Sequence, residues 1–416
     1  MNDLPSLDVL LQDKGAQAIH AVYQARGRTV KFVGGCVRDI LAGIPIGDID
    51  LAVDAEPEDG LKWLSEAGIT VKATGLKYGT ITAIIHKKPY EITTLRRDIK
   101  TDGRWAEVVY GTSWEEDAQR RDFTINGLFC TMDGQVEDHV GGVEDLQQGH
   151  IRFIGDAATR IREDYLRILR LFRFWARFGK SDIDKATLAA VQENAEGIAN
   201  LSKQRVWAEL KKTLSLPRVA EALRQMQAAH ITPYIFNPDV FHLRHLEKLL
   251  DYETAAAVPA CAQEQASKSL RHLAALHLQD IHRGNWSVNW QDLSERFLLS
   301  GHETDHLSVL NLFGEKPDYW LERPNAALYQ FEPDVLADAY LLCAVTDHLD
   351  ADQLRTKLYT TRQSQKMHLP VTANDLMERG YKAGPELGAA LHKVRQYWLD
   401  HDCQPDQDEC LTALKN

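Results

Sequence analysis

A glycine turn followed closely by two aspartates constrains this chain more than any other feature. Residues 33–53 read VGGCVRDILAGIPIGDIDLAV. Side chains alternate between the two faces of a strand, so a strand over Ile46–Val53 would present Asp48 and Asp50 on the same face. Two carboxylates this close repel each other unless a cation lies between them, and hard oxygen ligands suit Mg²⁺. The strand is therefore predicted to carry a metal site.

The residues before this strand predict a phosphate cradle. Gly34 and Gly35 have no side chains, so the backbone can approach a ligand closely, and Arg38 offers paired donors to phosphate oxygens. Metal-binding carboxylates beside a phosphate cradle indicate phosphoryl or nucleotidyl transfer. The alternative is an ordinary turn before an exposed strand end. The joint occurrence of the glycines, the arginine and the aspartates favours the chemical interpretation.

The patterning predicts an α/β head followed by helices. With 416 residues the chain exceeds the size at which one core suffices, so we expect more than one domain. Strands are predicted at 30–33, 79–86 and 90–95, and a Lys-Lys-Pro turn joins the last two. A further short strand is predicted at 151–155. Beyond it strand signals nearly vanish, and apolar residues recur at helical spacing. The predicted helices are Ala157–Phe178, Val206–Leu214, Arg218–Gln227, Leu243–Leu250 and Ala266–Leu278, with a helix-turn-helix around Gly380–Gly388.

The charge is unevenly distributed. A formal net charge of −12 argues, on average, against a nucleic-acid partner, since phosphate binding relies on basic surface. Between residues 152 and 177, however, arginines outnumber acids, and a local basic face on an acidic protein can still hold RNA. The arginines of this face are Arg160, Arg162, Arg167, Arg170, Arg173 and Arg177.

The cysteines and the apolar segments bear on the compartment. Six cysteines form no CxxC pair, which indicates neither a zinc knuckle nor a disulfide framework. We expect no membrane span and no signal peptide, because no apolar stretch is long enough and the N-terminus lacks a basic start. Cys36, inside the glycine turn, is predicted to be a small buried filler. A cytoplasmic, reduced protein is the simplest expectation.

Glu91 is a candidate third carboxylate. It lies in the predicted strand YEITTL, and beside the aspartates it would complete a two-metal site that clamps the attacking and leaving oxygens. The alternative is an ordinary strand glutamate that faces solvent.

The segment EDAQRRDFTIN, residues 116–126, predicts contacts to a nucleotide. Arg120 and Arg121 could grip a triphosphate, and Asp122 could accept a hydrogen bond from a ribose hydroxyl. Asn126, four residues on, would share its helix face. A cluster of salt bridges at a helix start is the alternative.

The segment REDYLRILRLFRF, residues 162–174, predicts base selection. On one continuous helix Asp164 and Arg167 would share a face, with Glu163 placed to hold Arg167. An acceptor beside a donor fork complements the amino group and ring nitrogen of cytosine and adenine, and opposes uracil and guanine. A mismatched polar pair costs about 1–3 kcal/mol per unsatisfied group, enough for strong discrimination. An arginine-rich amphipathic helix with routine ion pairs is the alternative.

Together these segments resemble a known family. GGCVRD, GDIDLAV, EITTLRRD, EDAQRRDFTIN and REDYLRILRLFRF occur in the order and spacing of the class II tRNA nucleotidyltransferases, which comprise CCA-adding enzymes and bacterial poly(A) polymerases. The similarity is strong over 30–178 and weaker over 201–214. It implies a polymerase-β-like mixed-sheet head at 1–148, followed by an all-α neck at 149–215, body at 216–360 and tail at 361–416, in the outline of a seahorse.

The resemblance also implies roles for the residues identified above. Asp48 and Asp50 would bind catalytic Mg²⁺ ions, and Glu163, Asp164 and Arg167 would form an amino-acid template for CTP or ATP. The triphosphate and ribose would be held by Gly34, Gly35, Arg38, Arg121, Asp122 and Asn126. Residues 97–113 resemble a flexible loop, including Asp102, Gly103 and Arg104, that is associated with the switch from C to A addition. The implied partners are the acceptor arm of tRNA, CTP and ATP, with no obligatory protein partner.

Other functions remain as alternatives. A poly(A) polymerase or a partial C- or A-adding enzyme would use the same scaffold, and a non-catalytic RNA-binding protein could keep the fold. Many relatives carry an HD phosphohydrolase domain, but residues 270–284 have Gln279-Asp280 where a His-Asp pair would be needed. We therefore predict no hydrolase site there, and expect the histidines of HETDH, residues 302–306, and His401 to lie on the surface.

Overall fold

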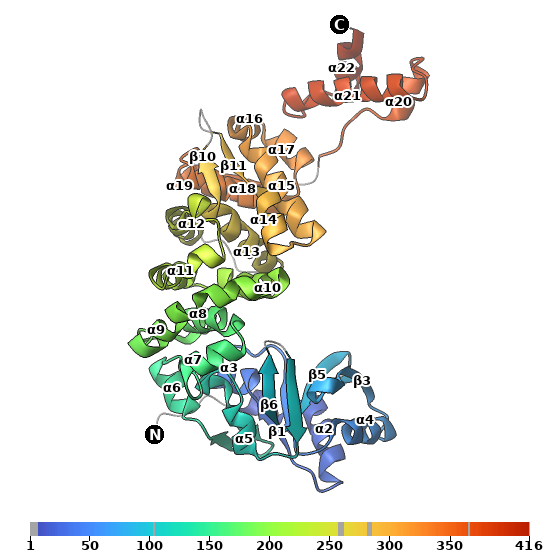
Figure 1. The fold of residues 1–416 in the computed structure, drawn as a ribbon. Helices are drawn as coiled ribbons and strands as arrows, with labels where there is room; N and C mark the ends of the chain where they lie inside the picture. Colours follow the sequence, from blue (N-terminus) through green and yellow to red (C-terminus); the bar gives the residue numbers. More distant parts are fainter. Residues whose placement is uncertain (1–6, 103–104, 257–261, 281–284, 365–366, 416) are drawn as a thin grey trace. The chain divides into compact units, whose positions relative to one another are not determined.

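The chain forms two compact units. In the computed structural model, which describes residues 7–102, 105–256, 262–280, 285–364 and 367–415, one unit comprises 1–209 with 216–235 and the other comprises 210–215 with 236–416 (Figure 1). The predicted mixed-sheet head and the many helices that follow it are confirmed. The division into head, neck, body and tail remains a prediction, because one compact unit can hold several such parts. Among the described residues no helix is long and apolar enough to cross a membrane.

A seven-stranded mixed sheet organises the first unit. Its order is β3-β4-β5-β2-β1-β8-β9, and β2 and β5 are its parallel pair. The strands are β1 (Val30–Val33), β2 (Asp50–Val53), β3 (Thr70–Gly75), β4 (Thr80–Ile85), β5 (Lys88–Thr94), β8 (Leu128–Thr131) and β9 (Val136–Asp138). The first predicted strand has the expected bounds. The strand with the aspartates is shorter than predicted, since it begins only at Asp50, and the turn between β4 and β5 uses His86 and Lys87 instead of Lys-Lys-Pro.

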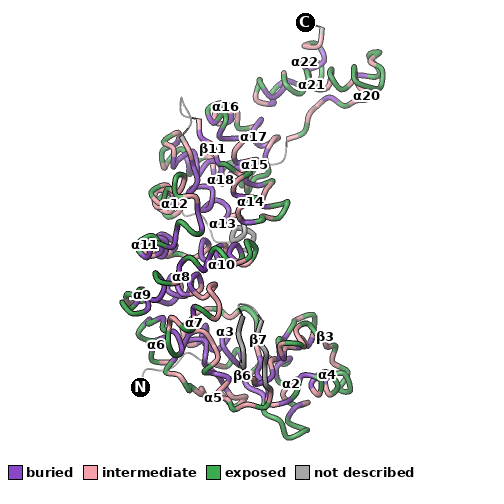
Figure 2. The backbone as a smooth tube through the Cα atoms, in the orientation of Figure 1, coloured by how far each residue is buried: buried purple, intermediate pink, exposed green. Residues whose placement is uncertain are grey.

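The same stretch of the chain contains helices, some of which pack on the two faces of the sheet. They are α1 (Asp8–Leu11), α2 (Lys14–Gln24), α3 (Gly35–Leu41), α4 (Pro57–Glu66), α5 (Trp114–Gln119) and α6 (Gly142–Gln148). On one face α4 contacts β3 and β4, and its Gly60 lies against Ile81. On the other face α5 contributes Ala118 to a core cluster with residues of β1, β2 and β8. Figure 2 shows the edge strand β3 largely exposed.

The segment predicted as a flexible loop is a β-hairpin. Strand β6 (Arg96–Asp102) pairs antiparallel with β7 (Trp105–Tyr110), and Asp102 is paired with Trp105 next to the tip. Gly103 and Arg104 lie outside the described residues. The described backbone of this segment is therefore a paired hairpin and not irregular chain, and its part in the switch from C to A addition remains a prediction.

The helix predicted over Ala157–Phe178 is two helices. α7 (Ala157–Glu163) ends where Asp164 takes an extended conformation, with φ −157° and ψ 106°, and α8 (Leu166–Phe178) follows. The carboxylate of Asp164 accepts the amide of Leu166 at 3.2 Å, so it competes with a continuous helix. The other helices here are α9 (Lys185–Glu193), α10 (Lys203–Leu214) and α11 (Val219–Ala228). The predicted strand at 151–155 is also wrong, since Phe153 forms only an isolated bridge with Phe123.

In its described residues the second unit is helical apart from one short hairpin. β10 (Leu278–Asp280) pairs antiparallel with β11 (Trp286–Val288), which corrects the predicted all-α body and the helix drawn to Leu278. The helices are α12 (Leu243–Ala255), α13 (Ala262–Leu276), α14 (Trp290–Phe297), α15 (Gly301–Gly314), α16 (Pro317–Glu322), α17 (Pro324–Gln330), α18 (Pro333–Val345), α19 (Ala351–Gln363), α20 (Ala373–Glu378), α21 (Pro385–Asp400) and α22 (Gln407–Thr412). The turn between α20 and α21 confirms the predicted helix-turn-helix.

A buried polar network lies in the core of this unit. Asp338 is 1% exposed and accepts hydrogen bonds from Arg271 and, at 3.0 Å, from His306 Nε2. Burial acts to raise the pKa of Asp338, but Arg271 and His306 outweigh it and hold the pKa at about 2. His306 is only 7% exposed, so its predicted surface position is wrong, whereas His302 and His401 are exposed as expected. His272, in the segment compared with hydrolases, is also buried, and Glu253 satisfies it.

The last helices contact α17 through a carboxylate cap. Asp402 accepts the backbone amides of Asn325 at 2.7 Å and Ala326 at 3.0 Å, the first turn of α17. We expect Asp402→Ala to lower the stability of this unit by about 1 kcal/mol, because those amides lose their acceptor. Asp402→Asn keeps a side-chain oxygen and should lose less. Thermal unfolding of both variants tests this, and equal melting temperatures for wild type and Asp402→Ala would contradict it.

Candidate active site

The glycine turn after β1 has a conformation that requires glycine. Gly34 adopts φ 69° and ψ −117°, and its amide donates to the carbonyl of Leu128 at 2.9 Å. A Cβ at Gly34 would lie 3.3 Å from Arg121 Nη1, so a side chain would crowd that guanidinium as well as strain the backbone. Gly35 then begins α3. The turn thus brings bare backbone next to Arg121.

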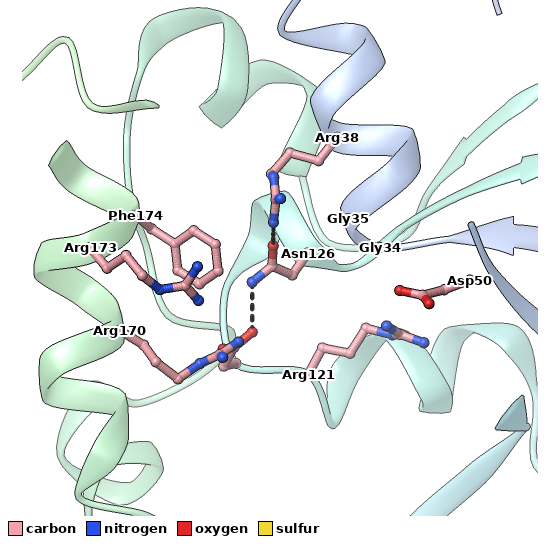
Figure 3. Close-up of a pocket in the computed structure, with 10 residues that line it drawn as sticks. Gly34, Gly35, Arg38, Asp50, Arg121, Asn126, Arg170, Arg173 and Phe174 are labelled. Carbon is pink, nitrogen blue, oxygen red and sulfur yellow. Dashed lines mark hydrogen bonds and ion pairs between the residues drawn. The ribbon is translucent and has the colours of Figure 1, made fainter. Parts of the chain in front are cut away.

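A pocket of about 310 Å³ opens beside this turn (Figure 3). Its charged lining contains four arginines and two aspartates, so it favours an anionic ligand. In Figure 3 the helix α8 supplies one wall, Arg38 reaches in from α3, and Arg121 lies beside Asp50. The lining residues are Gly34, Gly35, Arg38, Asp50, Arg121, Asp122, Asn126, Arg170, Arg173 and Phe174.

The predicted carboxylates meet at the β2–β5 pair. Asp50 opens β2 and is paired in register with Glu91 of β5, so the two side chains leave the same face of the sheet. Asp48 is exposed just before the strand, while Ile49 between them is buried. Burial raises the pKa of Asp50, and Glu91 and Asp48 raise it further, to about 6, although Arg121 and Arg38 oppose the shift. The negative charges are therefore crowded, as the metal interpretation requires.

The carboxylates fit a divalent metal whose remaining ligands come from a nucleotide. Within the described part of the chain, no group of three or more His, Cys, Asp or Glu side chains is arranged to hold a metal by itself. Mg²⁺ is commonly held by one or two carboxylates together with substrate phosphates and water, not by an all-protein cage. Asp48 and Asp50, next to a pocket that favours anions, match this donor set.

Asp122 is held tightly at the back of the pocket. Its Oδ2 accepts Arg170 Nε at 2.6 Å, and its Oδ1 accepts Asn126 Nδ2 at 2.9 Å. Burial acts to raise the pKa of Asp122, but Arg170 and the hydrogen bonds from Asn126 and Arg170 hold it at about 2. The group is therefore ionised, and it connects residues 120–126 with α8.

The two arginines of the triphosphate prediction are both positioned by one buried acid, Asp117. Arg121 donates to Asp117 Oδ2 from Nη2 at 2.8 Å, while Arg120 donates to Asp117 Oδ1, also at 2.8 Å. Arg38 is 7% exposed, donates to Asp39 at 2.6 Å from Nη2, and lies 4.6 Å from the ring centre of Phe178. Of these three arginines, Arg38 and Arg121 line the pocket and Arg120 does not.

The predicted template residues form three ion pairs around the break between α7 and α8, of which only Glu163–Arg167 joins the two helices. Glu163 accepts Arg167 and, at 2.6 Å, Arg160 Nη1. Asp164 accepts Arg205 Nη2 at 2.7 Å. Arg160 also donates from Nη2 to the carbonyl of Arg121 at 2.6 Å, which links this group to the pocket. Glu163 holds Arg167 as predicted, but none of the three template residues lines the pocket itself.

Sequence reasoning overlooked several residues of this region. Arg170 and Arg173 were expected only as part of a basic face, and Phe174 not at all, yet all three line the pocket. Their spacing on α8 gives a usable signal, since positions 170, 173 and 174 share a helix face. Arg205, which binds Asp164 from α10, has no local signal. Cys36 is buried as predicted, and burial raises the pKa of its thiol to about 11.

Family models match two stretches of the chain. Residues 30–152 match the poly A polymerase head domain. Residues 182–243 match a model described as a probable RNA and SrmB-binding site of polymerase A. The first match contains the glycine turn, both aspartates and Asn126.

Similar proteins cover nearly the whole chain. CCA tRNA nucleotidyltransferase 1, mitochondrial, of Homo sapiens is 34% identical over 97% of this chain and 90% of its own length. A CCA-adding enzyme of Streptococcus sanguinis is 30% identical over 94% of each chain. Among solved structures, the Bacillus stearothermophilus CCA-adding enzyme in complex with CTP superposes with a TM-score of 0.75, at 26% identity over 96% of each chain.

Proposed function

Because the chain belongs to the CCA-adding tRNA nucleotidyltransferases of class II, we propose that it adds C, C and A to the 3′ end of tRNA from CTP and ATP. The assignment of the site rests on one observation. The arginine-rich pocket ends at Asp50, which is paired in register with Glu91 on the neighbouring strand. A nucleoside triphosphate offers the negative charge that the arginines favour, and its phosphates can share a metal with the carboxylates.

In this proposal the triphosphate lies along the glycine turn. Gly34 and Gly35 leave room for phosphate oxygens, and Arg121 is oriented toward them by Asp117. Arg38 adds positive charge from the opposite wall. Asp122 and Asn126 would provide groups for the ribose. They are hydrogen-bonded to each other, and Asp122 also accepts from Arg170 while Asn126 accepts from Arg38. In this arrangement the α-phosphate would lie near Asp50.

The chemistry is transfer of a nucleotidyl group. The 3′ hydroxyl of the tRNA attacks the α-phosphate, a phosphodiester bond forms, the bond to the β-phosphate breaks, and pyrophosphate leaves while the hydroxyl proton passes to solvent. Asp48 and Asp50 would hold the divalent metal that this family uses, which we propose is Mg²⁺. Such a metal neutralises charge on the nucleotide and on the attacking oxygen. Glu91 lies beside Asp50 in register and is proposed as a third carboxylate of the site.

We propose that Asp164 and Arg167 select the base of the incoming nucleotide. Among the described residues, the hydrogen bonds of Arg167 leave from Nη1, toward Glu163 and the carbonyl of Arg160. Nε and Nη2 can therefore serve an acceptor on a base. Asp164 keeps acceptor capacity on both oxygens beside its bond to Arg205. This pair of groups matches cytosine and adenine.

An incorporation assay tests the function. We expect tRNA lacking CCA to gain C, C and A, tRNA ending in CC to gain one A, and complete tRNA to gain nothing, with UTP and GTP rejected. Runaway addition of A, or a stop after CC, would replace the proposal by poly(A) polymerase or partial addition. Lack of any incorporation with intact RNA binding would favour a non-catalytic protein. If the protein does not incorporate nucleotides but hydrolyses cyclic nucleotides in the presence of Ni²⁺, the result would indicate a phosphohydrolase.

The cytoplasm remains our proposal for the compartment. It rests on the cysteine spacing, and Cys36, Cys130, Cys343, Cys403 and Cys410 are free thiols in the described part of the chain. The relative from Homo sapiens carries the word mitochondrial in its name, so relatives do not all share one compartment.

A further inference from the structure

Four residues form one row across the sheet. Asp50 of β2 is paired with Glu91 of β5, Glu91 with Thr82 of β4, and Thr82 with Lys72 of β3. Side chains of paired residues leave the same face of a sheet, so this cross-strand row begins at the proposed catalytic carboxylates and ends at a lysine on the sheet edge. Three steps between strands separate its ends by about 14 Å.

The outer part of this row faces solvent and is polar. Lys72 and Glu91 are exposed, and Thr82 is half-buried with its hydroxyl 2.7 Å from that of Thr74. Alternate residues of β4, such as Ile81 and Ala83, are buried on the opposite face, against which α4 packs. Among the described residues Lys72 forms no ion pair, so its ammonium group can serve a ligand.

The direction in which the tRNA 3′ hydroxyl attacks the α-phosphate bears on what this face binds. The attacking and leaving oxygens lie roughly in line at the phosphorus atom. In the proposed function the leaving pyrophosphate lies in the pocket, whose arginines are on the Gly34 side of Asp50 (Figure 3). The attacking hydroxyl must then arrive from the other side of Asp50. That side is β5, with the cross-strand row beyond it.

We infer that the exposed face of β3, β4 and β5 binds the backbone of the RNA strand that carries the attacking 3′ hydroxyl, with Lys72 contacting a phosphate upstream of the terminal nucleotide. The inference rests on the proposed function and extends it to a substrate-binding surface. Threonine hydroxyls can form hydrogen bonds with the phosphate or ribose oxygens of RNA of any sequence. Such a surface would position the strand end without reading its bases.

Substitution of Lys72 tests the inference. We expect Lys72→Glu to raise the KM for tRNA lacking CCA roughly three- to tenfold, as for loss of one exposed charged contact. The kcat at saturating tRNA and the KM for CTP and ATP should stay within twofold of wild type. With Lys72→Ala, the slope of log affinity for tRNA against log salt concentration should become shallower by about 0.7.

Lys62→Glu is the matched control. Lys62 is also exposed, but it lies on α4, which packs against the opposite face of the sheet. Its substitution changes the net charge identically and should leave the KM for tRNA unchanged. If the Lys72 variants match the Lys62 variant in KM and in salt slope while wild type completes CCA ends, this inference is wrong and the proposed function stands. Failure of wild type to incorporate nucleotides would instead overturn the proposed function.

Discussion

Asp50→Ala is expected to lower the rate of CMP and AMP incorporation by at least about a thousandfold. The substitution removes a carboxylate that we propose as a metal ligand, and stabilisation of charge by such a site contributes several kcal/mol to the transition state, where each 1.4 kcal/mol is tenfold. Affinity for tRNA should change little, because the RNA is held mainly by cationic side chains. Single-turnover incorporation and a filter-binding measurement separate the two effects.

Asp50→Asn separates the effect on activity from the effect on stability, because activity should be lost while stability is kept. Burial, Glu91 and Asp48 all disfavour the charged form of Asp50. A neutral amide of the same size relieves this crowding, so the variant should melt no lower than wild type although it is as inactive as Asp50→Ala. A lower melting temperature would indicate that the carboxylate supports the fold and that lost activity reflects damage to the sheet.

Asp54→Asn provides the control at the other end of β2. Asp54 accepts the amide of Thr29 at 2.7 Å, a contact that an asparagine oxygen can keep. The same chemical change on the same segment should therefore leave incorporation near the wild-type rate. Wild-type activity in Asp50→Ala would remove the aspartate pair from the mechanism altogether.

The elements predicted correctly from sequence are those whose signals are local. Alternating apolar residues located β1, β4 and β5, and helical spacing located α10 to α13 within a few residues. The break at Asp164 also has a local signal, since aspartate before an apolar helical run is a typical helix start. The Asp-Gly pair at 102–103, between segments rich in β-branched and aromatic residues, likewise indicates a hairpin.

The relations that assemble the site are long-range. Apart from the placement of Glu91 beside the aspartates, which its residue type suggested, they could not be predicted. Glu91 reaches Asp50 only because β5 inserts parallel to β2, after two further strands have formed. Asp164 finds Arg205 across 41 residues, and Asp122 finds Arg170 across 48. Pairing over such distances depends on how the sheet and helices pack, which no spacing within one segment encodes. Residue types thus suggested the chemistry, while the fold determines which groups meet.

Arg167→Ala is expected to reduce discrimination against UTP and GTP by about tenfold to a hundredfold. The guanidinium is the donor half of the proposed template, and one unsatisfied polar group costs about 1–3 kcal/mol, so its removal makes correct and incorrect bases more nearly equal. Because Arg167 is only one of the arginines on the basic face and Glu163 already holds its guanidinium, affinity for tRNA should stay close to wild type. The ratio of kcat/KM for each of the four nucleotides, on tRNA lacking CCA, measures the effect.

Two further variants distinguish base pairing from packing. Glu163→Gln keeps the size of the side chain but weakens its hold on Arg167, so it should relax base choice less than Arg167→Ala does, without loss of stability. Arg162→Ala removes an exposed arginine of α7 and should leave selectivity unchanged. If Arg167→Ala still rejects UTP and GTP as wild type does, Asp164 and Arg167 do not read the base. Relaxed selectivity in the Arg162 variant would instead show that the charge of this face, not the geometry of one donor, controls which nucleotide reacts.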